Sequence, residues 1–302
     1  QTVGYRMRLE HKISRQTRIE VITEGILTRL LQQDPALESV GLVIFDEFHE
    51  RSLEADLALS LCLKGRDLFR DTDHPLKLLV MSATLDSSAL VNLLDHAPLI
   101  RSEGRTYPVD MIYGQAAKPG ERIVDRMLTT LRQALTDNPD SSILAFLPGQ
   151  AEIHRTAESL GEWLLERRLR DVYLYPMYGN LTLEEQQQAI APLTKTGARK
   201  VVLATNIAET SLTIEGVDVV VDAGLVREAR FDPGTGMTGL HTTRISRASS
   251  TQRAGRAGRL APGRCYRLWT EGQQEQLAAH STPEILRADL APLALQLLQW
   301  GI

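Results

Sequence analysis

Two adjacent carboxylates directly follow a short apolar run in the first part of the chain. The run Leu42–Phe45 leads straight into Asp46 and Glu47. An apolar run without polar alternation is typical of a strand covered on both faces, and ligands of parallel α/β sheets collect at the carboxyl ends of the strands. An acid at that point can hold Mg²⁺ beside the phosphates of a nucleotide, and its neighbour can take a proton from an attacking water. Alone, the pattern fits a buried strand with an acidic turn equally well.

A second group of residues that can do chemistry is a series of arginines spaced three apart. The series consists of Arg253, Arg256 and Arg259. On a helix expected near residues 249–259 these side chains share roughly one face, and guanidinium forks suit phosphate oxygens. Gly255 and Gly258 weaken such a helix by around 1 kcal/mol each relative to alanine, so we expect something to approach closely there. The alternative is a solvated basic helix face, which the paired glycines make less attractive.

Polar residues follow two more of the expected strands. Ser82 comes directly after the strand Lys77–Met81, which places it beside Asp46 at the same sheet edge. Ser82 and Thr84 can relay contact from a phosphate site, although a bare Ser-Ala-Thr is most often a helix N-cap. In the second half of the chain, Thr205 and Asn206 follow an apolar strand and can bond the phosphates of a nucleic acid.

Further along this loop, Ser211 and Glu215 can face a ribose or a metal-bound water. An ordinary strand-to-helix turn rich in capping residues is the alternative for the whole loop. Asp222 ends another apolar strand, but it lacks an adjacent second carboxylate. We therefore expect Asp222 to have a structural role.

Strands and helices alternate along the chain, which predicts right-handed crossovers and parallel sheets. A single core is unusual for 302 residues, so two α/β domains are expected. The stretch 105–120, with its prolines and glycines, is the expected junction between them. The predicted domains are 1–104, 105–270 and a third module that starts at 271–302 with an apolar-striped helix over 283–300. The turn residues 232–236 predict a β-hairpin over 225–246.

Composition narrows the classes of function that fit. A net charge of -4 means that any nucleic-acid surface must be local, and an aromatic content of 5% favours contacts to the backbone over base stacking. Cys62 and Cys265 lie far apart without metal-type spacing, which fits a reducing compartment. No apolar run is long enough to cross a bilayer and no signal peptide starts the chain, so we expect a cytoplasmic protein with no membrane partner.

One phosphate-binding element is absent from the sequence. No Gly-x-x-x-x-Gly-Lys-Ser/Thr loop occurs, and the chain contains no Gly-Lys pair at all. The chain also begins at Gln1 rather than at a methionine. We therefore expect it to be a fragment of a longer protein, with the loop upstream.

Taken in order, these segments resemble the DEAH-box branch of the superfamily 2 ATP-dependent RNA helicases, most closely the bacterial HrpB type. Asp46-Glu47-Phe48-His49 is similar to the Walker B motif of that branch, and Phe48 is the residue found in the HrpB type. The other similar segments are Val3–Arg8, Thr23–Gly25, Ser82–Thr84, Phe146–Gly149, Tyr178–Leu181, Thr205–Glu215 and Gln252–Arg259. The resemblance covers essentially the whole chain.

The resemblance implies a fold of two RecA-like parallel-sheet domains, the first one truncated at its N-terminus. Residues 1–104 would be the C-terminal part of the first domain, with the Walker B and Ser-Ala-Thr motifs. Residues 105–270 would be the second domain, and residues 271–302 would begin a winged-helix and helical module.

The resemblance also implies the role of each site residue. Asp46 would hold Mg²⁺ through its water shell, and Glu47 would polarise the hydrolytic water. His49 and Gln252 would couple the two domains, while Arg256 and Arg259 would act on the phosphates. The residues that would serve the nucleotide in other ways are Ser82, Thr84, Ser211 and Glu215. The residues that would contact RNA are Arg8, Thr23, Gly179, Asn180, Thr205 and Asn206.

The implied activity is hydrolysis of ATP·Mg²⁺ coupled to 3′-to-5′ movement along single-stranded RNA and to its unwinding. Without the phosphate loop, this chain is expected to be inactive alone and active only as part of the full-length protein. Two other functions stay open at this point. One is a non-hydrolysing nucleic-acid-binding module, and the other is a DNA helicase with the same core.

Overall fold

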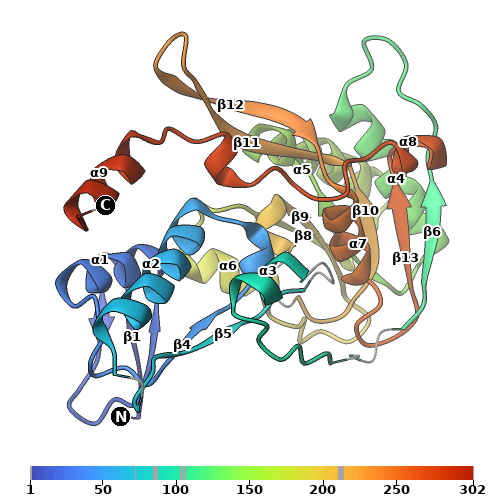
Figure 1. Cartoon of the computed structure of the whole chain (residues 1–302). Helices are drawn as coiled ribbons and strands as arrows, with labels where there is room; N and C mark the ends of the chain where they lie inside the picture. The colour runs from blue at the N-terminus through green and yellow to red at the C-terminus, as the bar shows by residue number, and fades with distance from the viewer. Residues whose placement is uncertain are drawn as a thin grey trace. The chain divides into compact units, whose positions relative to one another are not determined.

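The computed structural model describes residues 2–71, 73–83, 88–102, 104, 107–209 and 214–301 (Figure 1). The chain divides into two compact units. The first consists of residues 1–93, 230–239 and 282–302, and the second of residues 94–229 and 240–281. Among the described residues, no helix is long and apolar enough to cross a membrane.

The second unit is built on a six-stranded sheet in which all neighbouring strands run parallel. The strands, in their order across the sheet, are β6 (Val109–Tyr113), β13 (Gly263–Arg267), β10 (Val217–Asp222), β7 (Ser142–Phe146), β9 (Arg199–Ala204) and β8 (Val172–Met177). The parallel α/β sheet that the alternation of strands and helices predicted is therefore confirmed.

Helices cover both faces of this sheet. The helices are α4 (Ile123–Asp137), α5 (Gln150–Glu166), α6 (Leu183–Ile190), α7 (Arg247–Gly255) and the short α8 (Glu271–Glu275). Successive residues of β7 show the two-sided burial, because Ile143 belongs to the apolar cluster that contains α4 and α5, and Leu144 to the cluster that contains part of α7. A strand buried on both sides explains why these segments read as continuous apolar runs.

The first unit contains two smaller sheets. Strand β1 (Val3–Arg6) pairs with β2 (His11–Lys12) and β3 (Ile19–Ile22), and β4 (Leu42–Phe45) pairs in parallel with β5 (Lys77–Val80). The helices are α1 (Glu24–Gln33), α2 (Leu53–Phe69), α3 (Ser88–Leu93) and α9 (Ala291–Gln299), with single turns η1 (Phe48–Glu50) and η3 (Glu284–Leu286). Helices α1 and α2 pack against each other.

The interpretation of strand β4 as covered on both faces is wrong for the described chain. Val43 and Phe45 are buried, but Leu42 and Ile44 are 46% and 53% exposed. Among the described residues nothing packs on that second face, so the apolar run alternates between buried and exposed side chains.

Two expected elements also need correction. The stretch 105–120, expected as a junction, contains β6, which is the edge strand of the large sheet. The single helix expected over 283–300 is broken into η3 and α9. The break has a local cause, because the Asp289 carboxylate accepts the Ala291 amide at 3.0 Å and Pro292 lies in the first turn of the new helix. The expected hairpin is present as β11 (Leu225–Asp232) and β12 (Met237–Arg244).

Candidate functional site

The two adjacent carboxylates lie at the carboxyl end of β4, as predicted. Asp46 is exposed, and its Oδ1 accepts the backbone amide of Glu47 at 2.8 Å. Glu47 itself has a left-handed backbone with φ +50°, a conformation that costs a residue with a side chain about 1 kcal/mol or more. This turn brings Phe48 into the core, where its ring meets Phe45 edge to face with centroids 6.2 Å apart. Burial of Phe48 therefore offsets the cost of the left-handed backbone at Glu47, and this backbone sets the position of the Glu47 side chain.

The donor set at this strand end fits Mg²⁺. This ion prefers oxygen ligands, keeps several waters, and is usually held by one or two carboxylates together with substrate phosphates. One oxygen of Asp46 is used by a local amide, which orients the carboxylate and leaves its second oxygen for a water-mediated ion. In the described ranges no group of three or more metal-ligating side chains occurs, so an ion at this site would need further ligands from outside the protein.

His49 joins the acidic motif to the segment that follows β5. Its Nδ1 accepts the Ala83 amide at 3.2 Å and lies 3.5 Å from Glu47 Oε2, and the ring is only 6% exposed. A nitrogen that accepts an amide proton carries none of its own, so Nδ1 does not donate to Glu47 in this arrangement. Ser82 is therefore held beside the acids as predicted, whereas Thr84 lies outside the described residues.

The second unit holds the arginine series, and the prediction that its three members share one helix face is wrong. Helix α7 ends at Gly255, so only Arg253 lies within it. Arg253 is 1% exposed and Arg256 is 8% exposed, whereas Arg259 is on the surface. The expected close approach is present at Gly258, where an added Cβ would lie 2.6 Å from Tyr107 O. It is absent at Gly255, where the described structure leaves open space.

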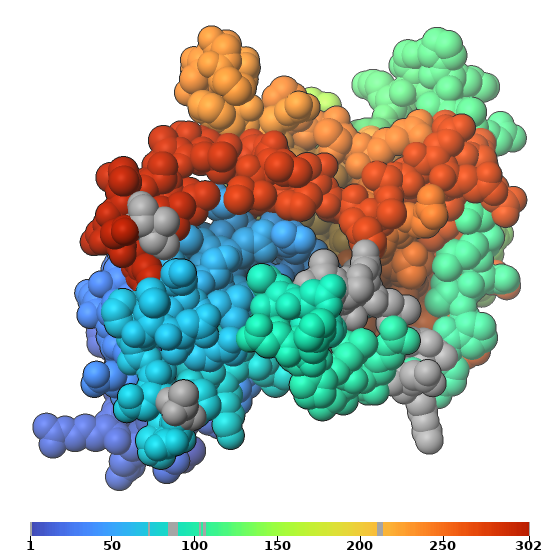
Figure 2. All heavy atoms as spheres, in the orientation of Figure 1, coloured from blue at the N-terminus to red at the C-terminus, as the bar shows by residue number. Residues whose placement is uncertain are grey.

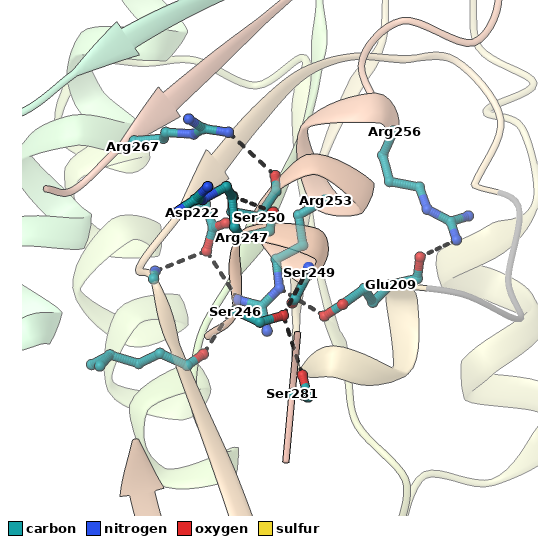
Figure 3. Close-up of polar contacts among 12 residues, drawn as sticks. Glu209, Asp222, Ser246, Arg247, Ser249, Ser250, Arg253, Arg256, Arg267 and Ser281 are labelled. Atoms are coloured by element: carbon teal, nitrogen blue, oxygen red, sulfur yellow. Dashed lines mark hydrogen bonds and ion pairs between the residues drawn. The ribbon is translucent and has the colours of Figure 1, made fainter. Parts of the chain in front are cut away.

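Arg253 lies at the centre of a buried ionic cluster (Figure 3). Its Nη1 donates to Asp222 Oδ1 and its Nε donates to Glu209 Oε2, both at 2.9 Å. A longer bond of 3.3 Å reaches Leu225 O, and the guanidinium stacks 4.8 Å from the ring centroid of Phe146. The ends of β10 and β7, the loop after β9 and the start of the hairpin are thus held by one side chain.

Burial and the charges of the partner side chains act in opposite directions on the pKa of both members of this pair. Complete burial raises the pKa of Asp222, an effect that Arg253 and the Gly224 amide oppose. Burial acts to lower the pKa of Arg253, but Asp222 and Glu209 together raise it above its ordinary value. Asp222 therefore has the structural role expected from the sequence, while the roles of Glu209 and Arg253 were missed. The sequence did contain a signal for the role of Arg253. Two arginines of the series, Arg256 and Arg259, were assigned to phosphates, and Arg253 was left without a ligand contact.

Arg256 is tied to the same cluster through Glu209. One Nη of Arg256 donates to the carbonyl oxygen of Glu209, whose carboxylate receives Arg253 (Figure 3). The backbone and side chain of one residue thus position two arginines. Gln252 is half-buried on α7, and Arg259 is exposed beyond it. This arrangement provides a guanidinium that is held firmly enough to receive phosphate oxygens in a fixed geometry.

Most of the remaining predicted contacts of the second unit lie at the carboxyl ends of two paired strands. Gly179 and Asn180 follow β8 and are exposed, and Thr205 and Asn206 follow β9. The Thr205 amide donates to Met177 O at 3.1 Å, which joins the two loops. Glu215 is exposed. Ser211 lies outside the described residues.

In the first unit, Arg8 and Thr23 line the same cavity, which has a volume of about 420 Å³. Thr23 is the N-cap residue of α1, but its side chain makes no capping hydrogen bond. By contrast, Ser52 caps α2 with its hydroxyl, which accepts the Ala55 amide at 3.1 Å. The two residues predicted to contact RNA here are thus brought together.

Residues 126–261, which make up much of the second unit, match the helicase conserved C-terminal domain.

The chain is 52% identical over 300 residues to the ATP-dependent RNA helicase HrpB of Escherichia coli (strain K12), covering 99% of this chain and 36% of that protein. It is 41% identical over 302 residues to the pre-mRNA-splicing factor ATP-dependent RNA helicase prp22 of Schizosaccharomyces pombe, covering 99% of this chain and 25% of that protein. The crystal structure of the Escherichia coli DEAH/RHA helicase HrpB matches with a TM-score of 0.91 at 52% identity, covering 100% of this chain and 37% of that one. The resemblance to the HrpB type is confirmed, and the chain spans between a quarter and about a third of these relatives.

Proposed function

We propose that the chain is the central part of an ATP-dependent RNA helicase. In this proposal NTP hydrolysis between two RecA-like domains drives movement along single-stranded RNA and its unwinding. The observation that carries the proposal is the Asp46–Glu47 pair at the carboxyl end of β4, in a chain 52% identical to an RNA helicase. Residues 1–104 belong to the first domain, 105–270 form the second, and 271–302 begin a winged-helix and helical module.

The residues on the nucleotide have separate tasks. Asp46 would hold Mg²⁺, which would supply neutralisation of the phosphate charge when it is bound. Glu47 accepts the proton of the attacking water, and its left-handed backbone limits where the carboxylate can point. Arg256, positioned by Glu209, stabilises the charge that develops on the transferred phosphoryl group, together with Arg259. Gln252 and His49 relay the state of the nucleotide between the domains.

The nucleic-acid contacts are mainly to the phosphate backbone. They come from Arg8 and Thr23 in the first unit and from the loops after β8 and β9 in the second. Such a grip predicts an affinity that falls steeply with salt. Because no Gly-x-x-x-x-Gly-Lys-Ser/Thr loop occurs in these 302 residues, we assign turnover to the whole protein, with ATP and Mg²⁺ as cofactors.

The test is the Glu47→Gln variant of the full-length protein, assayed for ATP hydrolysis with saturating RNA. Loss of the proton acceptor should lower kcat by about 100-fold or more and leave nucleotide binding intact. The matched control is Glu38→Gln, which makes the same charge change at an exposed site of the same unit. Undiminished turnover in Glu47→Gln would refute the assigned base. Stimulation measured with RNA and with DNA of matched sequence identifies the polynucleotide.

A further inference from the structure

The cavity of about 420 Å³ in the first unit is lined by residues from both ends of the chain. It lies where the start of α1 faces α9. The polar and charged residues on its wall are Arg8, Thr23, Thr28, Arg29, Gln32, Glu54, Gln296 and Gln299. The two glutamines of α9 belong to none of the segments that predicted an RNA contact.

Helix α9 is anchored on the first unit at its C-terminal end, and the turn η3 upstream of it is anchored as well. Trp300 Nε1 donates to Leu31 O at 3.0 Å, and its ring packs edge to face on Phe69 with centroids 6.1 Å apart. Upstream of α9, the Glu284 carboxylate accepts the Leu53 amide at 2.8 Å, at the start of α2. Figures 1 and 2 both show this C-terminal segment, in red, against the blue helices. The C-terminal end of α9, next to Gln299, is therefore anchored on the first unit.

The charges in the cavity favour an anionic ligand. Arg8 and Arg29 provide two guanidinium groups. The acid on the wall, Glu54, already accepts the Thr28 hydroxyl at 3.1 Å. A guanidinium fork is suited to phosphate oxygens. The wall formed by α9 carries no charge, because its two lining residues are glutamines, whose side chains are neutral amides.

Four of the polar side chains that line this cavity have no polar partner among the described residues. Across the described ranges, the side chains of Arg8, Arg29, Gln296 and Gln299 take part in no hydrogen bond or ion pair. An amide both donates and accepts, so it can bind a group that does the same. In a nucleotide, such groups are the ribose hydroxyls and the base edges, which lie next to the phosphate.

We propose that Gln296 and Gln299 are nucleic-acid contacts that bind the neutral part of a nucleotide whose phosphate is held by Arg8 and Arg29. This inference rests on the proposed function, since it adds a sugar or base contact to a grip otherwise made on phosphates. The ligand is a segment of single-stranded nucleic acid. Helix α9 thereby gives the first unit a means of recognising more than the charge of the strand.

The test uses the full-length protein with Gln296→Ala and Gln299→Ala combined, and a fluorescent single-stranded oligouridylate. Alanine preserves the helix, and the control is Gln33→Ala, an exposed residue of α1 that does not line the cavity. Affinity for RNA should fall about tenfold in the double variant and stay unchanged in the control. The slope of log affinity against log salt should not change, because no charge is lost.

Two comparisons separate the possible outcomes. Arg8→Gln should weaken binding and reduce the salt slope by about one. The same titration with oligodeoxyuridylate distinguishes the two neutral partners, since a loss confined to RNA assigns the 2′-OH and an equal loss with DNA assigns the base edge. Unchanged RNA affinity in the glutamine variant, with binding weakened in Arg8→Gln, overturns this inference and leaves the proposed function standing. Failure of the wild-type protein to bind RNA overturns both.

Discussion

Arg253 and Asp222 form an ion pair of 2.9 Å in which neither side chain is more than 1% exposed. The carboxylate ends β10, and the guanidinium comes from α7, which packs on the same strand. The second acid, Glu209, holds the Nε side of the guanidinium and also receives Arg256 through its carbonyl oxygen. The buried cluster around Arg253 thus contributes to stability. Through Glu209 it also positions Arg256, a proposed catalytic residue.

Replacing Arg253 with methionine should destabilise the chain strongly. The change leaves Asp222 buried and uncompensated, so the free energy of unfolding should fall by about 3–5 kcal/mol in urea denaturation followed by circular dichroism. The double variant Arg253→Met, Asp222→Asn removes both charges and should recover part of that loss. Arg122→Met, which breaks the exposed pair with Asp125, is the control and should produce no measurable change. Equal, small effects at both arginines would contradict this prediction.

The two glycines between the arginines should respond in opposite ways to alanine. At Gly258 the new Cβ would lie 2.6 Å from Tyr107 O and 2.7 Å from Val109 Cγ2, so Gly258→Ala should cost about 1–3 kcal/mol. At Gly255, the last residue of α7, nothing described lies within 4 Å, and alanine should be neutral or stabilising by up to about 1 kcal/mol. Thermal unfolding of the two variants side by side measures the difference, and a stable Gly258→Ala variant would disprove the close approach.

Lys200 should stabilise the C-terminal end of α6. It is 2% exposed, and its Nζ donates to the carbonyl oxygens of Ala189, Ile190 and Ala191, each at 3.1 Å. Burial lowers the pKa of this lysine. Lys200→Met leaves the carbonyls without donors and should lower the free energy of unfolding by about 2–3 kcal/mol. Lys195→Met, at an exposed position in the following loop, should have no such effect in the same denaturation experiment.

The two cysteines should make stability depend on pH in the alkaline range. Burial raises the pKa of both Cys62 and Cys265 to about 12. A raised pKa means that the stabilisation is fully present below the pKa of the unfolded thiol, about 8.5, and is lost as pH rises toward 12. The limiting slope is about 1.4 kcal/mol per pH unit for each thiol. Denaturation of the wild type and of the Cys62→Ala, Cys265→Ala variant between about pH 8 and pH 11 checks this, because other titrating groups are common to both. Parallel stability curves would show that the thiols do not contribute.

Much of the fold could be predicted from local patterns. The apolar runs of the second unit are strands, the apolar-striped segments are helices, and the hairpin lies at the predicted turn. The errors occur where a partner distant in sequence decides the outcome. Strand β4 has the apolar run of a fully covered strand, yet Ile44 is exposed because no described element packs on it. Strand β6 was missed because it lies in a stretch that contains two prolines and two glycines.

The candidate site also contains features that local sequence predicts and features that it does not. Asp46 and Glu47 were placed correctly because position at the end of a strand is a local property, and β5 pairs with β4 as the repeating strand–helix pattern requires. The link from His49 to Ala83 was not predictable, because it depends on the left-handed backbone at Glu47 and on where the chain leaves β5.

By itself the sequence determined the alternation of strands and helices, the acids at a strand end, and an order of motifs specific enough to indicate a helicase. Only the tertiary structure decided that Arg253 and Arg256 are buried and that Arg259 is exposed. A residue type and its spacing specify charge and helical phase, but burial depends on partners brought together by folding. For Arg253 these partners lie 31 and 44 residues away. The glutamines of α9 meet the cavity of Arg8 for the same reason, because Trp300 and Glu284 pack the end of the chain onto its beginning.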